Sequence, residues 1–434
     1  MNKTLNDTST QTDAHVHREC KNIITGQQIG LLGGPLYTTY KVLGAIRLAK
    51  QLNGAAIYWL ETNDADFNEI NHIDYLDDQG QLKTLTWDID THGYASGYIE
   101  VDETLEKILE TFFSTIRQTE FTPGLKKMVL DCYRRGRSLA EASQDLAEEL
   151  FGHFKIRLFT PFDWEFKKFS QRILRREAVH TLDGQQCNCF CMLGKQRKAL
   201  FRDNRCFLTR DKMPINLLTS ELVPNVKTRS ICQDAFFKTH TYVAGPGEIK
   251  YLAELDPVYE YHGIKKAAIQ PRMSITLLEP KVKRLLEKTG VTPEKILQST
   301  REELLKIEMG KETGLAFNEI LENAATLAAE FLEKLQALGI EEAEIKSLRK
   351  TLQDEIKKTI GQMRSRTKGK VGQQLKQVAF LSDNLKPFGK RQERVFNIIY
   401  YMNLFGGKKF IDWLYDQYDP SREFLEIEND ESKK

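Results

Sequence analysis

The sequence predicts an α/β protein built on a parallel sheet, with a long helical segment in its second half. Residues 24–52 and 243–264 each begin as an apolar strand, pass through a glycine-rich turn and continue as a helix. The run at 55–60 (AAIYWL) is apolar without alternation, which is typical of a strand buried on both faces of a parallel sheet. Residues 341–385 contain no proline and repeat apolar side chains every three or four positions, which predicts a long helix.

Length and charge limit the classes of protein to consider. A chain of 434 residues is too long for one small core, so we expect two or more packing units. The composition, 41% hydrophobic and 29% charged, is typical of a globular protein with exposed helices. The net charge of +2 gives no overall attraction to nucleic acid or an anionic membrane, so any polyanion binding must be local.

The sequence favours a reducing compartment. It has no run of about 18 apolar residues, and its polar first 20 residues, which we expect to be disordered, lack the apolar core of a signal peptide. The seven cysteines are an odd number spread over a long chain, which favours free thiols over a disulfide framework. We therefore expect a cytoplasmic protein.

The first βαβ unit can be followed residue by residue. Ile23 and Ile24 begin a strand, residues 33–35 form the turn, and Val42 and Leu43 start the apolar stripe of the next helix. With the strand at 55–60 these elements predict a right-handed crossover.

The remaining patterns divide the chain into three parts. Residues 1–278 form the predicted core, with a helical insertion at about 101–180 that a short apolar piece at 156–159 interrupts and with alternating strands at 187–210. Residues 279–385 form a predicted α-helical coiled-coil domain, and 386–434 a C-terminal segment that returns to the core. The helix at 318–338 and the long helix after it predict a hairpin. The long helix has a narrow apolar seam, which consists of Ile345, Leu348, Leu352, Ile356, Ile360 and Met363. This seam needs a partner to bury it, either the other helix of the hairpin or a second subunit.

Ligands of open parallel sheets bind beyond the carboxyl ends of the strands, and three polar clusters follow apolar runs in this way. The first is the turn at 25–35, where Gln27 and Gln28 lie beside a helix N-terminus. A tight turn with two surface amides explains it equally well. Neither glycine-rich phosphate-binding motif is present in it.

The second and third clusters contain acidic residues. ETNDADFNEINH places Asp64, Asp66 and His72 after the strand at 55–60, where carboxylates can bind an ammonium group or a metal and a histidine can act as a base. A helix capping box from Asp66 to Glu69 is the alternative. The third cluster, at 245–248, joins two glycines to Glu248, which could instead only complement a helix dipole.

Three other features carry less weight. Cys187, Cys189 and Cys191 alternate, but no second Cys or His pair lies nearby, so we expect small apolar residues on a strand and predict no metal site. His15 and His17 have no expected role. A basic run could contact phosphates, although a solvated helix face is the better interpretation; it consists of Arg364, Arg366, Lys368 and Lys370.

Six motifs in this order resemble one family, the bacillithiol biosynthesis cysteine-adding enzymes, over about residues 23–415. They are TGQQIGLLGGPLYTTYK (25–41), DFNEINH (66–72), VPNVKTRSICQD (223–234), YVAGPGEIKYLAEL (242–255), PRMSIT (271–276) and GKRQERVFN (389–397). The resemblance implies a Rossmann-like core, similar to class I aminoacyl-tRNA synthetases, with helical insertions and a coiled coil that makes a homodimer. It also implies a carbon–nitrogen ligase that joins L-cysteine to glucosaminyl-malate, the last step of bacillithiol biosynthesis.

The resemblance and the three clusters together give the candidate site. The catalytic candidates are Asp64, Asp66, His72 and Glu248. The substrate-binding candidates are Thr25, Gly26, Gln27, Gln28, Gly33, Gly34, Tyr37, Gly245, Gly247 and Arg272. Where the family typically reads Glu-Asp-His-Asp, this chain has Asn63-Asp64-Ala65-Asp66, and its lead-in before the first motif is shorter.

Amide formation from a carboxylate and an ammonium group is uphill in water, so the carboxylate must be activated. ATP is the obvious agent, yet the sequence has neither a P-loop nor an H-x-G-H motif, and the cofactor stays open. Our hypothesis is that the two glycine turns donate N–H groups to anionic substrate groups, Asp64 and Asp66 hold the amine or a metal, and His72 is the base. We expect small-molecule substrates and a homodimer, with no membrane and no nucleic acid. The alternatives are a non-catalytic relative that binds an amino sugar or amino acid, and RNA binding by the helical hairpin.

Overall fold

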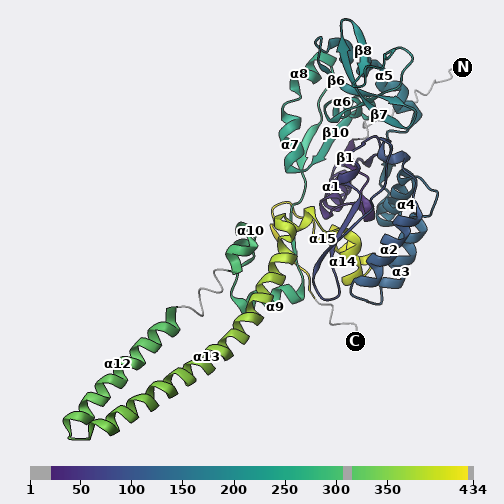
Figure 1. Ribbon diagram of the computed structural model, residues 1–434. Helices are drawn as coiled ribbons and strands as arrows, with labels where there is room; N and C mark the ends of the chain where they lie inside the picture. Colours follow the sequence, from purple (N-terminus) through teal and green to yellow (C-terminus); the bar gives the residue numbers. More distant parts are fainter. Residues whose placement is uncertain (1–20, 306–314, 429–434) are drawn as a thin grey trace, which may run out of the picture. The chain divides into compact units, whose positions relative to one another are not determined.

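The computed structural model describes residues 21–305 and 315–428, and these form two compact units (Figure 1). The first unit contains the described residues up to 27 together with 41–63 and 151–272. The second contains 28–40, 64–150 and the described residues from 273 onward. The predicted disorder of residues 1–20 and the two histidines there lie outside the described residues.

A five-stranded sheet forms the centre of the first unit. Its strand order is β11-β10-β1-β2-β5, and the pairs β1–β10, β10–β11 and β2–β5 are parallel, so the predicted parallel sheet is confirmed. The strands are β1 (Asn22–Gln28), β2 (Ala55–Glu61), β5 (Arg157–Phe159), β10 (Thr239–Ala244) and β11 (Ala268–Pro271). The short apolar piece at 156–159 is thus an edge strand of the central sheet.

Helices follow these strands in the predicted order. The first glycine turn leads into α1 (Leu36–Leu52), and the second leads into α7 (Pro246–Ala253) and α8 (Asp256–His262). Helix α6 (Val226–Phe237) precedes β10, and the Asn225 side chain accepts hydrogen bonds from the first-turn amides of Lys227 and Thr228. This cap fixes where α6 starts and thereby which of its side chains face the sheet.

A second sheet in the same unit is antiparallel, with the order β8-β7-β6-β9. Its strands are β6 (Gln186–Leu193), β7 (Gln196–Asp203), β8 (Cys206–Thr209) and β9 (Leu222–Pro224), and helix α5 (Trp164–His180) packs against β6 and β9. Cys187, Cys189 and Cys191 are buried on alternate positions of β6, which confirms the predicted strand. In the described part of the chain, no group of three His, Cys, Asp or Glu side chains could hold a metal ion.

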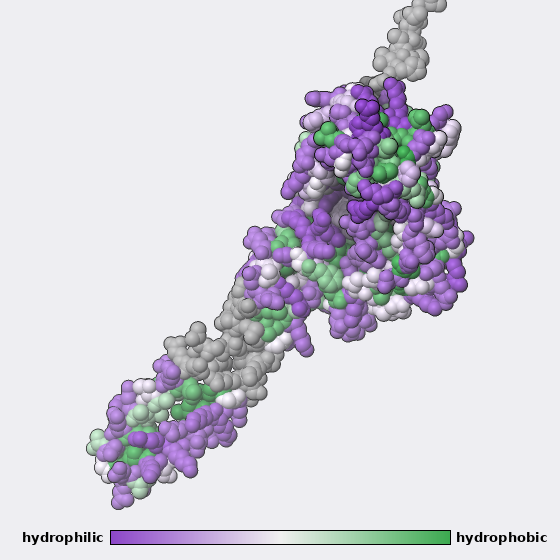
Figure 2. Space-filling model, turned by 45° about the horizontal axis from the view of Figure 1, so that its top comes forward, coloured by the Kyte–Doolittle hydropathy of each residue, from purple (hydrophilic) through white to green (hydrophobic). Residues whose placement is uncertain are grey.

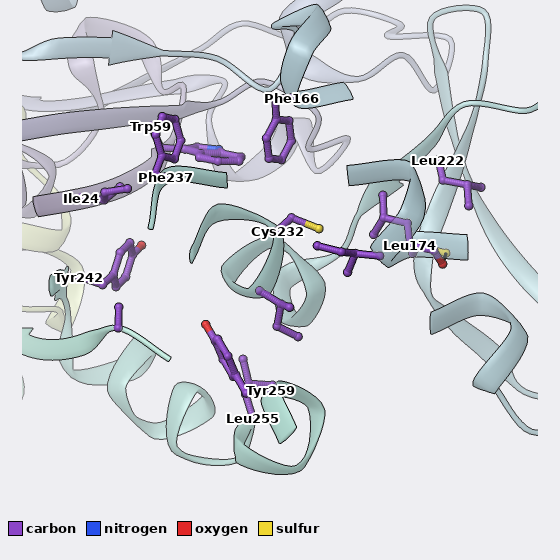
Figure 3. Packing of buried hydrophobic residues seen from close by; sticks show 14 of the residues in the cluster. Ile24, Trp59, Phe166, Leu174, Leu222, Cys232, Phe237, Tyr242, Leu255 and Tyr259 are labelled. Carbon is purple, nitrogen blue, oxygen red and sulfur yellow. Dashed lines mark hydrogen bonds between the residues drawn. The ribbon is translucent and has the colours of Figure 1, made fainter. Parts of the chain in front are cut away.

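One aromatic core joins the two sheets of this unit (Figure 3). The Trp59 ring lies 4.8 Å from Phe159 and 5.0 Å from Phe166 between centroids, and Phe159 lies 4.8 Å from Phe237. These contacts connect β2 and β5 to α5 and α6. They hold the carboxyl end of β2 and one side of α6 in fixed positions, on which the site described below depends.

The second unit is mostly helical. It contains α2 (Glu103–Thr115), α3 (Thr122–Cys132) and most of α4 (Leu139–Phe151), which confirms the helices predicted for that stretch, and a hairpin of β3 (His72–Leu76) and β4 (Leu82–Thr86). Helices α14 (Ile398–Leu404) and α15 (Lys409–Asp416) belong to the same unit, and β12 (Thr276–Leu278) pairs with β13 (Phe424–Glu426). The Leu36 amide donates to the Phe396 carbonyl at 2.7 Å, so the C-terminal segment packs on the first glycine turn.

The predicted helical hairpin is also confirmed. Helix α12 (Leu315–Ala337) packs along α13 (Glu342–Leu385), whose 44 residues correspond to about 66 Å (Figure 1). In the predicted seam Ile345 and Ile360 are buried, whereas Leu348 is exposed and the side chain of Met363 lies outside the described residues. At its base α13 packs on α9 (Pro280–Thr289) and α10 (Pro293–Gln298) through Val378, Leu381 and Leu385.

The described helices were also compared with the length and hydropathy that a membrane-spanning helix needs. Not one of them is both long and apolar enough to cross a bilayer.

Candidate active site

Lys41 joins three segments of the first unit. Its side chain is only 1% exposed, and Nζ forms an ion pair with Glu248 Oε2 at 2.7 Å. Nζ also donates to the Gly26 carbonyl and, at 3.2 Å, to Gln27 Oε1. Because an ammonium group has three N–H donors, all of them are used. Lys41 therefore acts as a fixed charge that positions Gln27 and Glu248.

Glu248 holds the second glycine turn together. Its Oε2 accepts the Gly245 N–H at 2.8 Å, and its Oε1 accepts the Tyr242 hydroxyl at 3.0 Å. This network is more than the dipole effect considered as an alternative, because the carboxylate closes a capping box and pairs with Lys41. Burial favours the neutral acid, but the charge and hydrogen bonds of Lys41 and the Gly245 N–H outweigh it and lower the pKa of Glu248. The side chain is 21% exposed, so it is not fully enclosed by protein.

Arg229 is a member of this network that the sequence reasoning missed. Its guanidinium donates to Gln233 Oε1 at 3.0 Å and to the Tyr242 hydroxyl at 3.3 Å. It also lies 5.9 Å from the centroid of the Trp59 ring, within cation–π range. The signal was a cation directly before the uncharged run SICQ of α6, in a buried stretch of helix where a charge persists only if it has partners.

The charges around Glu248 are predominantly positive. Lys41 and Arg229 are buried, and so is Arg272, whose Nε lies 3.3 Å from where a Cβ on Gly245 would stand. Glu248 acts on both Lys41 and Arg229, and Glu61 also acts on Arg229. A group of buried cations in a low-dielectric place favours binding of a carboxylate or another anion. We call Gln27, Lys41, Arg229, Tyr242 and Glu248 the Lys41 cluster.

The glycines of this unit differ in role. A Cβ on Gly26 would lie 3.3 Å from both Arg229 Nη1 and Trp59 Cβ, so this position needs a small residue for packing. A Cβ on Gly247 would meet nothing within 4 Å, so the backbone there is open. The Thr25 hydroxyl donates to the Val243 carbonyl at 2.9 Å and ties β1 to β10.

The acidic bend lies in the second unit. Gln28 Nε2 donates to Asp64 Oδ2 and, at 2.8 Å, to Glu69 Oε2, while the Asp66 amide donates to Asp64 Oδ1 at 3.2 Å. The capping-box alternative is wrong, because Asp66 precedes a 3-10 turn at Phe67–Glu69 and its side chain accepts no cap hydrogen bond there. The exposed Asp66 carboxylate can therefore face a ligand.

His72 and Tyr37 have other neighbours in that unit. His72 is the first residue of β3, its side chain is 38% exposed, and its Nε2 lies 3.8 Å from Asp74 Oδ2. The structure thus brings Gln28, Asp64 and Asp66 together and places His72 beside Asp74. Tyr37 lies at the start of α1, with the Arg394 guanidinium 5.9 Å from the centroid of its ring.

The first glycine turn uses its amides internally. Gly33 and Gly34 have φ of +83° and +72°, in the left-handed region that glycine adopts without strain. The amides of Leu31, Gly33, Gly34 and Leu36 donate to the carbonyls of Ile70, Gly30, Leu31 and Phe396. Four amides are thus committed to the fold, which argues against our hypothesis that this turn donates N–H groups to an anionic substrate.

The second unit also has a cavity that no predicted site residue lines. Its volume is about 770 Å³, which is within the range of small-molecule sites. Its lining is aromatic and charged and includes Phe121, Phe405, Trp413, Arg117, Lys281 and Lys409. These six residues come from three distant parts of the sequence, so no local pattern marks the cavity.

Comparison with known proteins decides the family. Residues 1–187 and 177–273 match the model of the bacillithiol biosynthesis BshC N-terminal Rossmann-like domain, and residues 275–427 match that of the BshC C-terminal coiled-coil domain. The chain belongs to the BshC family. The core is accordingly Rossmann-like and the helical hairpin belongs to the coiled-coil domain of this family, as the resemblance implied.

Curated BshC relatives match most of the chain, and their printed names describe ligases. Proteins named "Putative cysteine ligase BshC" from Anoxybacillus flavithermus, Salinibacter ruber and Chlorobaculum tepidum are 26%, 26% and 27% identical. The alignments cover 92%, 88% and 89% of this chain and 83%, 78% and 79% of those proteins. Among solved structures, tryptophanyl-tRNA synthetase of Plasmodium falciparum aligns over 86% of this chain and 84% of its own, at 9% identity and a TM-score of 0.25, too low to carry an argument. The chain is thus a member of a ligase family.

The lowered pKa of Glu248 predicts a specific dependence of stability on pH. A carboxyl whose pKa falls on folding stabilises the folded state above its ordinary value of 4.5, and this contribution is lost as the pH falls through the folded pKa. We expect the free energy of unfolding of the wild type to decrease more steeply below pH 4.5 than that of Glu248→Gln. Urea denaturation between pH 3 and 7 measures both slopes. The exposed Glu254→Gln on the same segment is the control and should keep the wild-type slope; equal slopes for Glu248→Gln would contradict the assignment.

Proposed function

We propose that this protein joins L-cysteine to glucosaminyl-malate through an amide bond and so forms bacillithiol. The observation that carries the proposal is the family match, which extends from residue 1 to 273 and from 275 to 427. Relatives named cysteine ligases over most of the chain support the cysteine substrate.

The Lys41 cluster supports a role in carboxylate binding. L-cysteine has one carboxylate and the malyl group of the other substrate carries more, and each suits a site that contains buried cations. Gly245 and Gly247 bring the backbone of the second glycine turn next to Glu248, whose position Lys41 and Tyr242 fix. In our proposal this turn binds the carboxylate of one substrate, with Arg272 and Arg229 neutralising its charge.

The acidic bend supports a role at the amine. The nitrogen of the sugar amine must lose a proton and attack the activated carboxyl carbon of cysteine, so that a C–N bond forms while the activating group leaves with a carboxyl oxygen. In our proposal Asp64, oriented by Gln28, and Asp66 bind the ammonium form, and His72, beside Asp74, accepts the proton. The activating agent stays unassigned. A cytoplasmic location also remains a prediction, which the free cysteines of the described residues support.

Product formation tests this proposal. Purified protein is incubated with L-cysteine, glucosaminyl-malate and a mixture of nucleoside triphosphates, and the reaction is analysed by mass spectrometry. We expect a thiol whose mass is the sum of the two substrates less one water. Binding of glucosaminyl-malate without any such thiol would favour the non-catalytic alternative.

We also propose that the protein is a homodimer whose contact includes α12. Four exposed apolar side chains recur on this helix and the following turn at spacings of 7, 4 and 7, which places them on one stripe: Ile320, Leu327, Phe331 and Leu338. Such a seam on an exposed hairpin is stabilised by a second copy.

The double substitution Leu327→Glu and Phe331→Glu tests the dimer. It places two carboxylates in the stripe, so we expect the mass in solution, measured by light scattering after gel filtration, to fall from dimer to monomer. Thr326→Glu with Ala329→Glu adds the same charge at exposed positions off the stripe and should leave the dimer intact. A monomeric wild type, or a dimer that survives the stripe variant, would contradict the proposal.

A further inference from the structure

One segment of the first unit is strongly basic although the whole chain is not. Residues 164–212, from α5 through β8, contain twelve lysines and arginines against five aspartates and glutamates, a net charge of +7, whereas the whole chain has +2. All other residues together therefore carry −5. Seven of the twelve cations are arginines, the cation that binds phosphate with two hydrogen bonds and also stacks on planar rings.

Helix α5 presents three of these cations on one face. Its opposite face is buried and packs through Phe166, Ile173 and Leu174. Lys168, Arg172 and Arg176 are exposed and follow Trp164 at intervals of four residues, so they lie along one side of the helix. Of the two acids on α5, Glu165 is exposed, whereas Glu177 is buried against His262 with a separation of 2.9 Å. The exposed side of α5 is thus predominantly cationic over about 18 Å.

Aromatic rings lie between these cations. The Trp164 side chain is 68% exposed, and Lys168 Nζ lies 5.3 Å from its ring centroid. Arg176 lies 4.4 Å from the centroid of Tyr261, and His180 stacks on the same ring at 4.2 Å with an interplanar angle of 23°. We call Trp164, Lys168, Arg172, Arg176, His180 and Tyr261 the α5 face.

The surroundings of the α5 face also expose apolar groups. Outside the α12–α13 hairpin, seven of the eight exposed large hydrophobic residues in the described part of the chain fall between 164 and 226. In Figure 2 hydrophobic side chains lie among strongly hydrophilic ones on the upper part of the surface. Single exposed apolar residues are ordinary, but four of these seven lie within the basic segment itself, and this concentration indicates a surface that contacts a partner: Trp164, Phe169, Val179 and Leu182.

We propose that the α5 face binds single-stranded RNA without sequence preference. Arginine and lysine contact the phosphates, while Trp164 and the Tyr261–His180 stack offer planes on which unpaired bases stack. A lipid surface is the less suitable partner, because the Tyr261 ring packs against Arg176 and His180 and is thereby held from inserting into acyl chains. This inference does not depend on the ligase activity. It also differs from RNA binding by the basic run at 364–370, whose side chains lie outside the described residues.

Fluorescence anisotropy with a labelled 16-nucleotide oligouridine, at 50 to 200 mM KCl, tests the proposal on the full chain. We expect binding whose affinity falls steeply with salt. Arg172→Gln with Arg176→Gln should reduce the slope of log affinity against log salt by about 1.4, since each lost phosphate contact on a single strand removes about 0.7. Trp164→Ala should weaken binding about tenfold with little change in that slope. Trp164→Phe keeps an aromatic ring for stacking, so its affinity should be close to that of the wild type.

Arg134→Gln with Arg135→Gln is the matched control. These two exposed arginines lie after α3, where each pairs with an acid, Asp131 and Glu106 respectively. We expect this variant to bind as the wild type does. The proposal is overturned if 20 µM protein gives no anisotropy change at 50 mM KCl, if the control weakens binding as much as the α5 variant, or if phosphatidylglycerol vesicles bind while RNA does not. Circular dichroism confirms that each variant is folded.

Discussion

Replacing Lys41 with methionine is expected to lower the free energy of unfolding by about 3–5 kcal/mol. The methionine fills a similar volume, but it removes the charge that pairs with Glu248 and the three donors that satisfy Gly26, Gln27 and Glu248. A carboxylate left without its partner in a mostly buried place is costly, and this cost dominates the effect. Urea denaturation at pH 7 measures it.

Two further variants test whether the loss of stability comes from the unpaired Glu248 carboxylate or from the loss of any lysine in α1. Lys50 is exposed on the same helix, and Lys50→Met should change the free energy of unfolding by no more than about 0.5 kcal/mol. Lys41→Met combined with Glu248→Gln should be more stable than Lys41→Met alone, because it removes the unpaired charge as well. If the free energy of unfolding of Lys41→Met were within about 1 kcal/mol of the wild-type value, Lys41 would not be the fixed charge that we describe.

The second large effect is on activity. Asp66→Ala is expected to reduce product formation at least about 100-fold, the lower range for a lost acid–base or charge-positioning group. Because Asp66 is exposed and its side chain caps no helix, the free energy of unfolding should change by no more than about 0.5 kcal/mol. The thiol formed per enzyme, quantified by mass spectrometry, measures the activity.

Asp88→Ala provides the matched control, since it removes another exposed acid of the same unit. It should keep full activity. Wild-type turnover in Asp66→Ala would exclude Asp66 from the reaction, and equal losses in both variants would show that the effect is not specific to the acidic bend.

Local patterns predicted most of the fold. The order β1, α1, β2 follows from apolar runs, a glycine turn and an amphipathic stripe within 40 residues, and the structure has these elements at the expected places. Strand β5 was not predicted as part of the central sheet. It is three residues long, and its partner β2 is about 100 residues away, so neither length nor periodicity marks it.

The site was harder to predict because the residues that contact one another in it are also far apart in the sequence. Glu248 and Gln27 were recognised as polar residues after apolar runs, but the charge that positions both of them comes from Lys41, which was not predicted. A lysine between Tyr40 and Val42, inside a fully buried run, was the available signal, and its acceptors lie as far as 207 positions along the chain. Backbone donors were overestimated: the amides of the first glycine turn looked available in sequence because their acceptors at Ile70 and Phe396 are remote.

Complementation in cells tests the central claim most directly. A bacterium that makes bacillithiol, deleted for its own cysteine-adding enzyme, supplies both substrates and whatever agent activates the carboxylate. Expression of this chain should restore the bacillithiol content, measured by mass spectrometry after thiol labelling, and remove the accumulated glucosaminyl-malate. If the protein is present and folded in those cells while bacillithiol stays absent and glucosaminyl-malate stays high, the proposed ligase activity is contradicted.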